Sequence, residues 1–316
     1  MLKACIKLLV WGIVLFIGGT VGLAALELNG YDISDVSIGG SSTDSIVMDE
    51  GITAFTTYIA DEEAVSELTV TQVSDKSEYG YVIDNFENAE DITSIKVNIR
   101  AGSFIINSSD RLSISCTYVN DDYFDYSVAD SCLTVSYMPK VSLSNFNFET
   151  FSFDEAQIVI DLPQKVYENA EFSVTAGELI ITSLVADNLS VDFSAGESVL
   201  QNVRAESSAD IVMTAGECTF ESCTFNNMAV KMTAGDMYIL HSEIPGVNNV
   251  KMTAGNLNME LLGKRDDYNI SVDRTAGEVY IDGDYTKGME KASGSYENEL
   301  DINITAGECN VSFYEY

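Results

Sequence analysis

One short phrase recurs along the second half of the chain and constrains its fold more than any other feature. Each copy contains a Ser or Thr, an Ala and a Gly, usually followed by an acid, as in Val174-Thr175-Ala176-Gly177-Glu178. Successive repeat glycines are 19, 20, 19, 20, 22 and 30 residues apart. A period near twenty is typical of a solenoid, in which each repeat buries its apolar face against its neighbours. The repeat glycines are Gly177, Gly196, Gly216, Gly235, Gly255, Gly277 and Gly307, and an earlier divergent copy contains Gly102.

Alternation around each glycine predicts two strands per repeat. In the first copy, Phe172 and Val174 precede the glycine and Leu179 and Ile181 follow it, with mostly polar residues between them. Most later copies repeat this pattern, so each coil should run strand, Gly corner, strand, with one face in the core. A glycine at the corner allows a positive φ or a close approach of the next coil. At ~4.8 Å per stacked strand, eight coils would make a rod roughly 35–40 Å long.

An apolar stretch near the N-terminus predicts a membrane anchor. Residues 8–26 carry no charge and follow Lys3 and Lys7. About 20 apolar residues span a bilayer, whereas a cleavable signal usually has an apolar region of only ~7–15. The basic flank places the N-terminus in the cytoplasm and the rest of the chain outside. Cleavage near Gly22-Leu23-Ala24 is the alternative.

The expected organisation has three parts, and the charge balance limits their partners. Residues 1–26 form a signal-anchor, residues 27–91 an acidic extracytoplasmic stalk that is partly ordered, and residues 92–316 the β-solenoid. The chain has 16 basic and 50 acidic residues. Nucleic acid is excluded because binding it requires a basic surface, and an anionic membrane surface is disfavoured for the same reason. The acid excess serves solubility or attracts divalent cations or basic partners.

Six cysteines do not indicate a disulfide framework. Cys218, Cys223 and Cys309 fall at inward positions, where cysteine commonly acts as a small apolar residue. Cys116 and Cys132 flank an antiparallel excursion over 117–131, and a disulfide between them is left open until geometry decides it. The chain contains no Cys-x-x-Cys, so a zinc ribbon has no support.

Further strands are expected before the regular repeats, and two expansions within them. Residues 95–106 match the repeat as a first coil, and 111–118 and 132–137 read as strands. The alternating segment 145–154 is either an edge strand or a loop. The expansions at 263–269 and 283–299 should lie on loops, often on one functional face.

These features together resemble a known bacterial family. The features are a short basic end with Gly18-Gly19 in the anchor, the strand Ile95–Gly102, the step Ile160-Asp161-Leu162-Pro163 and the serial repeat. They resemble the adhesin-like β-strand-repeat proteins of unknown function, including those of the Lia envelope-stress operon, over 92–316 and the anchor. Family members usually have Ser-Gly-Asp where this chain has Ala-Gly-Glu. The resemblance implies an all-β, single-stranded, right-handed parallel β-helix-like solenoid outside the cytoplasmic membrane, without established catalytic residues.

Two columns of side chains are candidates for binding chemistry. Stacked carboxylates after the glycines would repel one another, and a cation such as Ca²⁺ could relieve this. Alternatively they extend into screening water, and no nine-residue calcium repeat or EF-hand loop is present. The column is Glu178, Glu197, Glu217, Asp236, Glu278 and Glu308. A hydroxyl column resembles the threonine rows of ice-binding solenoids, but hydrogen bonding to turn backbone is expected. It comprises Thr175, Ser194, Thr214, Thr233, Thr253, Thr275 and Thr305.

Some residues depart from the repeat. Arg274 interrupts an apolar column, so it needs a partner such as Asp273 or Glu299 if buried, or it reaches water through a bulge or the nearby second expansion. His241 is the single histidine and is expected on polar surface at a turn. A group of acids and bases near the expansions is of the kind that polysaccharide-cleaving β-helices use. It comprises Asp266, Asp267, Asp282 and Asp284 with Lys264 and Arg265.

The sequence therefore favours a non-catalytic, membrane-anchored extracytoplasmic scaffold for binding, adhesion or envelope sensing. Its partner would be a cell-wall polymer, an envelope protein or another copy of itself. No catalytic residue, cofactor or metal ligand is assigned. The alternatives are a β-helix carbohydrate-active enzyme and an accessory protein of an envelope-stress signalling system.

Overall fold

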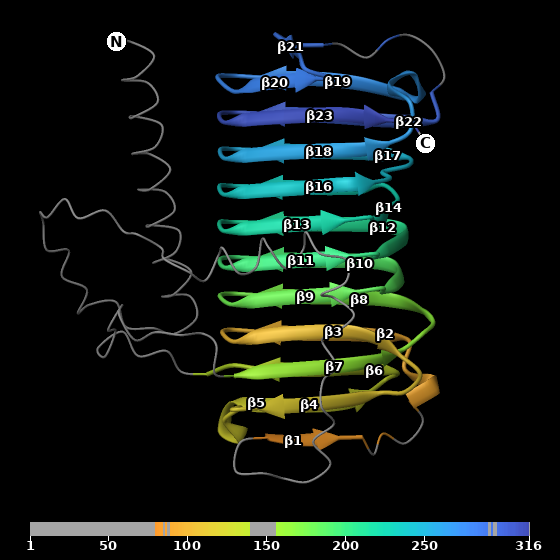
Figure 1. Cartoon of the computed structure of the whole chain (residues 1–316), viewed down its shortest axis with the longest axis vertical. Helices are drawn as coiled ribbons and strands as arrows, with labels where there is room; N and C mark the ends of the chain where they lie inside the picture. The colour runs from red at the N-terminus through yellow and green to blue at the C-terminus, as the bar shows by residue number, and fades with distance from the viewer. Residues whose placement is uncertain are drawn as a thin grey trace, which may run out of the picture.

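A computed structural model describes residues 80–84, 86, 89–139, 156–289, 292 and 296–315. These residues form a stack of two sheets whose strands lie mostly parallel, one level above another (Figure 1). In this part of the chain no helix is long and apolar enough to cross a membrane. The predicted anchor at 8–26, the stalk up to residue 79 and the segment 145–154 lie outside the described residues.

Each parallel coil of the stack contributes a strand to sheet A and a strand to sheet B. In spatial order, sheet A is β1 (Gly80–Ile83), β4 (Ser113–Thr117), β7 (Gln157–Pro163), β3 (Ser103–Ser109), β9 (Glu178–Thr182), β11 (Glu197–Gln201), β13 (Glu217–Glu221), β16 (Asp236–Ser242), β18 (Asn256–Leu262), β23 (Glu308–Tyr314), β20 (Glu278–Ile281) and β21 (Asp284–Thr286). Sheet B is β19 (Tyr268–Arg274), β22 (Asn298–Ile304), β17 (Val247–Met252), β15 (Met228–Met232), β12 (Arg204–Met213), β10 (Val185–Phe193), β8 (Val166–Val174), β2 (Ser94–Ile99), β6 (Cys132–Tyr137) and β5 (Phe124–Ala129), with β14 (Thr224–Phe225) also pairing with β12. Short 3₁₀ turns are η2 (Ala89–Asp91), η3 (Asp121–Tyr123) and η6 (Arg265–Asp267).

The predicted alternation is confirmed. In all seven regular repeats, the two apolar positions before the glycine and the two after it are buried, with the sole exception of Arg274. Neighbouring levels pair in register, so Leu200 lies beside Ile181 on one side and Phe220 on the other. The core is therefore a continuous column of apolar side chains between the two sheets.

The glycine corner is where successive coils approach most closely. Gly196 has φ +107°, and a Cβ added there would lie 2.1 Å from the carbonyl oxygen of Gly177. That oxygen accepts the backbone N–H of Glu197 at 3.1 Å. Both reasons predicted for the glycine, positive φ and close approach, hold at this corner.

The opposite corner of the regular coils also takes a left-handed residue, and the chain mostly uses polar residues there, with Gly263 (φ +126°) at the corner after β18. Ser183, Asn202, Ser222 and His241 have φ between +46° and +58°. The N–H groups of Ser183, Asn202 and Ser222 continue the stack, as in the bond from Ser183 N to Gln201 O at 2.9 Å. The sequence pattern does not predict this second corner, because short polar residues tolerate the left-handed region without marking it.

The order of levels differs from the order of the sequence at both ends. The coil β6–β7 lies on one side of β2–β3 and β8–β9 lies on the other. At the far end, the last coil, β22–β23, lies between β17–β18 and β19–β20. The colour gradient of Figure 1 is accordingly broken at two places. The expectation that each repeat stacks on its sequence neighbours is therefore wrong at these two places.

Antiparallel strands close both ends of the stack. At one end β1 pairs with β4 and β5 pairs with β6, and at the other β21 pairs with β20. Met289 forms a further antiparallel bridge to Val272 of the terminal strand β19. Because β1 begins at Gly80, sheet pairing extends into the segment predicted as stalk.

The cysteine thiols in the described chain are free. Cys116 lies in β4 of sheet A and Cys132 in β6 of sheet B, and the disulfide left open by the sequence is not formed. Cys218, Cys223 and Cys309 are buried in the core as predicted. Burial raises the pKa of each of these three thiols to about 12, which makes them unreactive.

Gly196→Ala should destabilise the protein through both the left-handed backbone and the clash with Gly177. We expect a loss of about 3 kcal/mol or more in the free energy of unfolding, measured by chemical denaturation. Gly283→Ala is the matched control, since Gly283 has φ +81° but no atom within 4 Å of an added Cβ. It should lose only about 1–2 kcal/mol. Equal losses in both variants would show that coil contact is not what requires Gly196.

Candidate functional site

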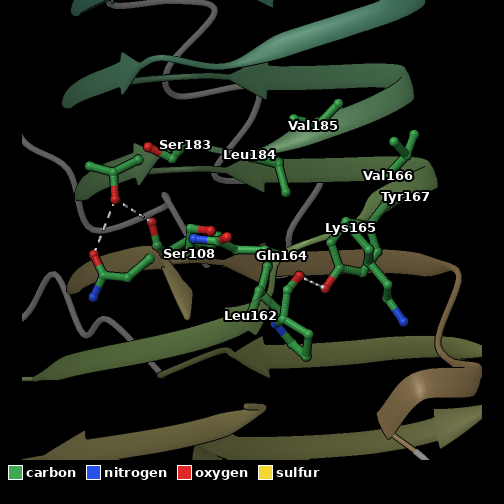
Figure 2. A pocket seen from close by; sticks show the side chains of 13 residues that line it. Ser108, Leu162, Gln164, Lys165, Val166, Tyr167, Ser183, Leu184 and Val185 are labelled. Atoms are coloured by element: carbon green, nitrogen blue, oxygen red, sulfur yellow. Dashed lines mark hydrogen bonds between the residues drawn. The ribbon is translucent and has the colours of Figure 1, made fainter. Parts of the chain in front are cut away.

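A cavity lies beside the end of β3, where the coil β2–β3 is followed by another strand of sheet A instead of a strand of sheet B. After β3 the chain continues to β4, which lies two strands away in the same sheet A. The connection from β7 to β8 passes the end of β3. The backbone bond from Gln164 N to Ser109 O at 3.1 Å joins the two segments. A cavity of about 350 Å³ remains, with Leu162, Leu184 and Val185 among its apolar walls (Figure 2).

The polar groups around this cavity are mostly occupied. The Thr182 hydroxyl donates to Ile106 O and the Tyr167 hydroxyl donates to Pro163 O at 2.9 Å. Burial raises the pKa of Tyr167 to about 12. Lys165, the charged residue among the lining side chains, donates to Ala89 O and Glu90 O at 3.2 and 2.9 Å. The cavity can hold a small uncharged group, and its lining offers no acid–base pair.

The predicted acid column forms a real row along one edge of sheet A. Glu178, Glu197, Glu217 and Asp236 are in-register neighbours on consecutive strands. Asn256 then interrupts the row, and Glu308 and Glu278 continue it in that spatial order. Sequence spacing therefore predicts the row correctly, but the swapped levels change its order.

Hydrogen-bond donors stabilise the two end carboxylates of the four-acid run. The two middle carboxylates, Glu197 and Glu217, are repelled by their acidic neighbours. The Ser103 hydroxyl donates to Glu178 at 2.7 Å, and the Asn256 amide donates to Asp236 at 2.6 Å. Partial burial and the carboxylates of Glu217 and Glu178 raise the pKa of Glu197. Partial burial and Asp236 likewise raise the pKa of Glu217. In the described chain, no group of three or more His, Cys, Asp or Glu side chains is placed to hold a metal ion.

The hydroxyl column also forms a row, at the glycine corner itself. The backbone N–H of each member extends the stack, as in Thr214 N to Phe193 O at 2.8 Å. The expected hydrogen bonds from these hydroxyls to the turn backbone are not formed within the described residues. Thr253, Thr275 and Thr305 are exposed, so these hydroxyls face solvent.

His241 lies on exposed polar surface, as predicted, but within β16 at a register irregularity between Ile239 and Ser242 rather than in a turn. Its Nδ1 lies 3.0 Å from Glu221 Oε1 and its Nε2 lies 3.6 Å from Glu260 Oε2. These acids belong to the levels on either side of its own. The histidine thus links three coils along the corner opposite the repeat glycines.

Arg274 is bound by the second expansion rather than by an acid. Its Nη1 donates to Gly277 O at 2.7 Å and its Nε donates to Lys287 O at 3.1 Å. The guanidinium lies 5.1 Å from the ring centre of Tyr285. Its contacts with Lys287 and Tyr285 confirm that it lies beside the second expansion, which binds the guanidinium rather than opening it to water, and in the described chain its hydrogen bonds do not go to Asp273 or Glu299.

The acids near the expansions do not form a paired catalytic site. Asp282 Oδ1 accepts the backbone N–H of Phe313 at 2.9 Å, so this carboxylate fixes a strand. Asp266 and Asp267 lie exposed in η6, and Asp284 begins β21. Arg265 donates to Tyr268 O at 3.1 Å, and Lys264 is the residue that precedes η6.

A row that the sequence pattern does not predict runs along the middle of the outer face of sheet A. Tyr238, Asn258, Asn310 and Tyr280 are in-register neighbours on β16, β18, β23 and β20. Each is the third residue after its repeat glycine, a position that alternation marks only as outward. On β7, β3, β9 and β11 the residues of the same row are aliphatic: Val159, Ile105, Ile180 and Val199.

The geometry defines a two-sheet parallel β-solenoid with out-of-order coils at both ends, and comparison with known proteins identifies its family. The chain belongs to the Toastrack DUF4097 family, whose model matches residues 92–296. No curated protein matches the chain.

The solved structures to which the chain is similar include two from bacteria. A cell adhesion candidate from Clostridium sporogenes is 16% identical, covers 74% of this chain and 99% of its own, and has a TM-score of 0.31. An adhesin candidate from Bacteroides fragilis is 12% identical, covers 74% and 98%, and has a TM-score of 0.33.

Glu197→Gln should stabilise the protein near neutral pH by removing repulsion from the row. We expect a gain of about 0.5 kcal/mol at pH 7, kept small because water screens a partly exposed carboxylate. The folded state holds this proton more tightly than the unfolded chain does. Wild type therefore gains stability as pH falls through the raised pKa, and the difference should vanish near pH 4.

Denaturation at several pH values measures this difference, with the exposed Glu315→Gln as control. A difference for Glu197→Gln that persists unchanged at pH 4, or that equals the control at pH 7, contradicts repulsion within the row.

Proposed function

We propose that this protein is a non-catalytic binding scaffold of the cell envelope, held at the membrane by residues 8–26 with its solenoid outside. The observation that carries the proposal is the outer face of sheet A. From β7 to β20 its outward side chains stand in registered rows, on parallel strands fixed by a continuous buried core. A rigid surface that repeats along one axis suits an extended partner that itself repeats, such as a cell-wall polymer.

The surroundings of the candidate catalytic residues support binding over turnover. The Asp282 carboxylate accepts a backbone hydrogen bond, and His241 lies between surface acids. The lining of the cavity beside β3 offers no acid–base pair. An active site would require a nucleophile or general acid held within hydrogen-bond reach of a partner group. The carbohydrate-active enzyme is therefore the weaker candidate. A role as an accessory protein in envelope-stress signalling is compatible with this scaffold. In that role the anchor would be the part that contacts a partner in the membrane.

Residues 27–316 should bind purified cell-wall material of the source organism saturably, in a pull-down with and without a calcium chelator. We expect chelation to leave binding unchanged, because the acid row lacks a metal-holding group in the described chain. Heat-denatured protein is the control for charge alone. Turnover of glycans that Asp266→Ala or Asp282→Ala abolishes would replace the scaffold by an enzyme. Absence of binding in both conditions would contradict a cell-wall partner.

A further inference from the structure

The outer face of sheet A from β16 to β21 differs from every other outward surface of the parallel strands. Tyr238 and Tyr280 stand about 14 Å apart, three strand spacings of ~4.8 Å, with Asn258 and Asn310 between them. Tyr285 of β21 continues the row, its ring centre 5.6 Å from that of Tyr280 and its residue 46% exposed. The outward positions of sheet B from β8 to β22 hold no aromatic side chain. Among the outward positions of the parallel strands in the described chain, aromatic side chains therefore lie only on sheet A, from β16 onward.

Hydrogen-bonding groups fill the space between the tyrosines. The Tyr280 hydroxyl donates to Glu278 at 3.0 Å, and the Asn310 amide donates to Glu308 at 2.9 Å, which fixes both side chains against the sheet. The Asn258 amide makes no side-chain hydrogen bond within the described chain, and its donor and acceptor remain available. Flat rings with amides between them match a sugar chain, which has apolar ring faces and hydroxyl edges.

The charges beside the row determine which sugar chain fits. Carboxylates of Asp236, Glu308 and Glu278 line one side. On the other side are Glu260 of β18 and Asp282, which follows β20 and accepts the Phe313 N–H through one oxygen. No Lys or Arg occupies an outward position of sheet A from β9 to β20. The Arg274 guanidinium lies 5.1 Å from the ring centre of Tyr285, so the stretch that favours a cation ends at Tyr280. A polyanion such as a phosphate-rich polymer would be repelled, whereas an ammonium group on a sugar would gain charge-assisted hydrogen bonds.

We propose that the outer face of sheet A between β16 and β20 binds a polysaccharide of amino sugars with free amines, lying across the strands along the row from Tyr238 to Tyr280. Tyr238 and Tyr280 stack against sugar rings, Asn258 bonds a hydroxyl, and the flanking carboxylates bind the ammonium groups. This inference rests on the proposed binding function and assigns its ligand class and its surface.

The test is titration of the full chain in detergent with a glucosamine hexamer, at a pH that protonates its amines. Its fully N-acetylated counterpart and hexalysine are the comparison probes. We expect the glucosamine hexamer to bind at least about tenfold more tightly than either. Tyr238→Ser and Tyr280→Ser should each weaken binding about three- to tenfold. Tyr118→Ser is the matched control, because Tyr118 is 57% exposed at the opposite end of the stack.

The outcomes separate stacking, charge and folding. Equal binding of hexalysine would reduce the site to electrostatics, and equal binding of the N-acetylated hexamer would remove the role of the carboxylates, so either overturns the proposal. Unchanged affinity in both tyrosine variants also overturns it. Thermal melts confirm that the variants fold. Cell-wall binding that survives both tyrosine substitutions would leave the scaffold function standing and place its ligand elsewhere.

Discussion

The contact between neighbouring glycine corners sets the geometry of the whole stack. At each regular level a backbone carbonyl of one corner accepts the N–H that follows the next glycine, as in Glu197 N to Gly177 O. A Cβ at this point would overlap the adjacent backbone. Because the coils meet at strand spacing, every side chain beyond the corner falls in register with its counterpart one level away. The buried column, the acid row and the tyrosine row are all consequences of that register.

A parallel stack of this kind has two open edges, and open edges invite aggregation. This chain closes them by folding back. β4, β1 and β5 run antiparallel at one end, and β21 and Met289 do so at the other. Both ends also place one coil out of sequence order, so the first parallel coil, β2–β3, and the last, β22–β23, each lie between two other coils. Arg274 is explained by this arrangement, since its level is terminal and its guanidinium meets the capping segment through Lys287 and Tyr285.

The sequence predicts what period and alternation can encode. Both faces of the strands, the corner glycine and the inward cysteines follow from side-chain spacing alone, because burial imposes a strict two-residue period. The order of levels does not follow, because each repeat presents the same columns, and any stacking order buries Val250 and Ile302 equally well. The left-handed corner at Ser183 and Asn202 was hidden because those residues are common on any surface. The tyrosine row was not predicted because burial does not constrain outward positions, so nothing in the alternation distinguishes them from ordinary polar surface.

The spatial order of the coils is the central structural claim, and disulfide trapping tests it directly. Asn258 and Asn310 are in-register neighbours, whereas Asn258 and Tyr280 are two levels apart, roughly 10 Å at ~4.8 Å per level. Disulfides form when Cα atoms lie about 4.4–6.8 Å apart. The doubly substituted Asn258→Cys/Asn310→Cys protein should therefore oxidise readily to an intramolecular bridge, and Asn258→Cys/Tyr280→Cys should not. The reverse result would show that the coils stack in sequence order and would contradict this fold.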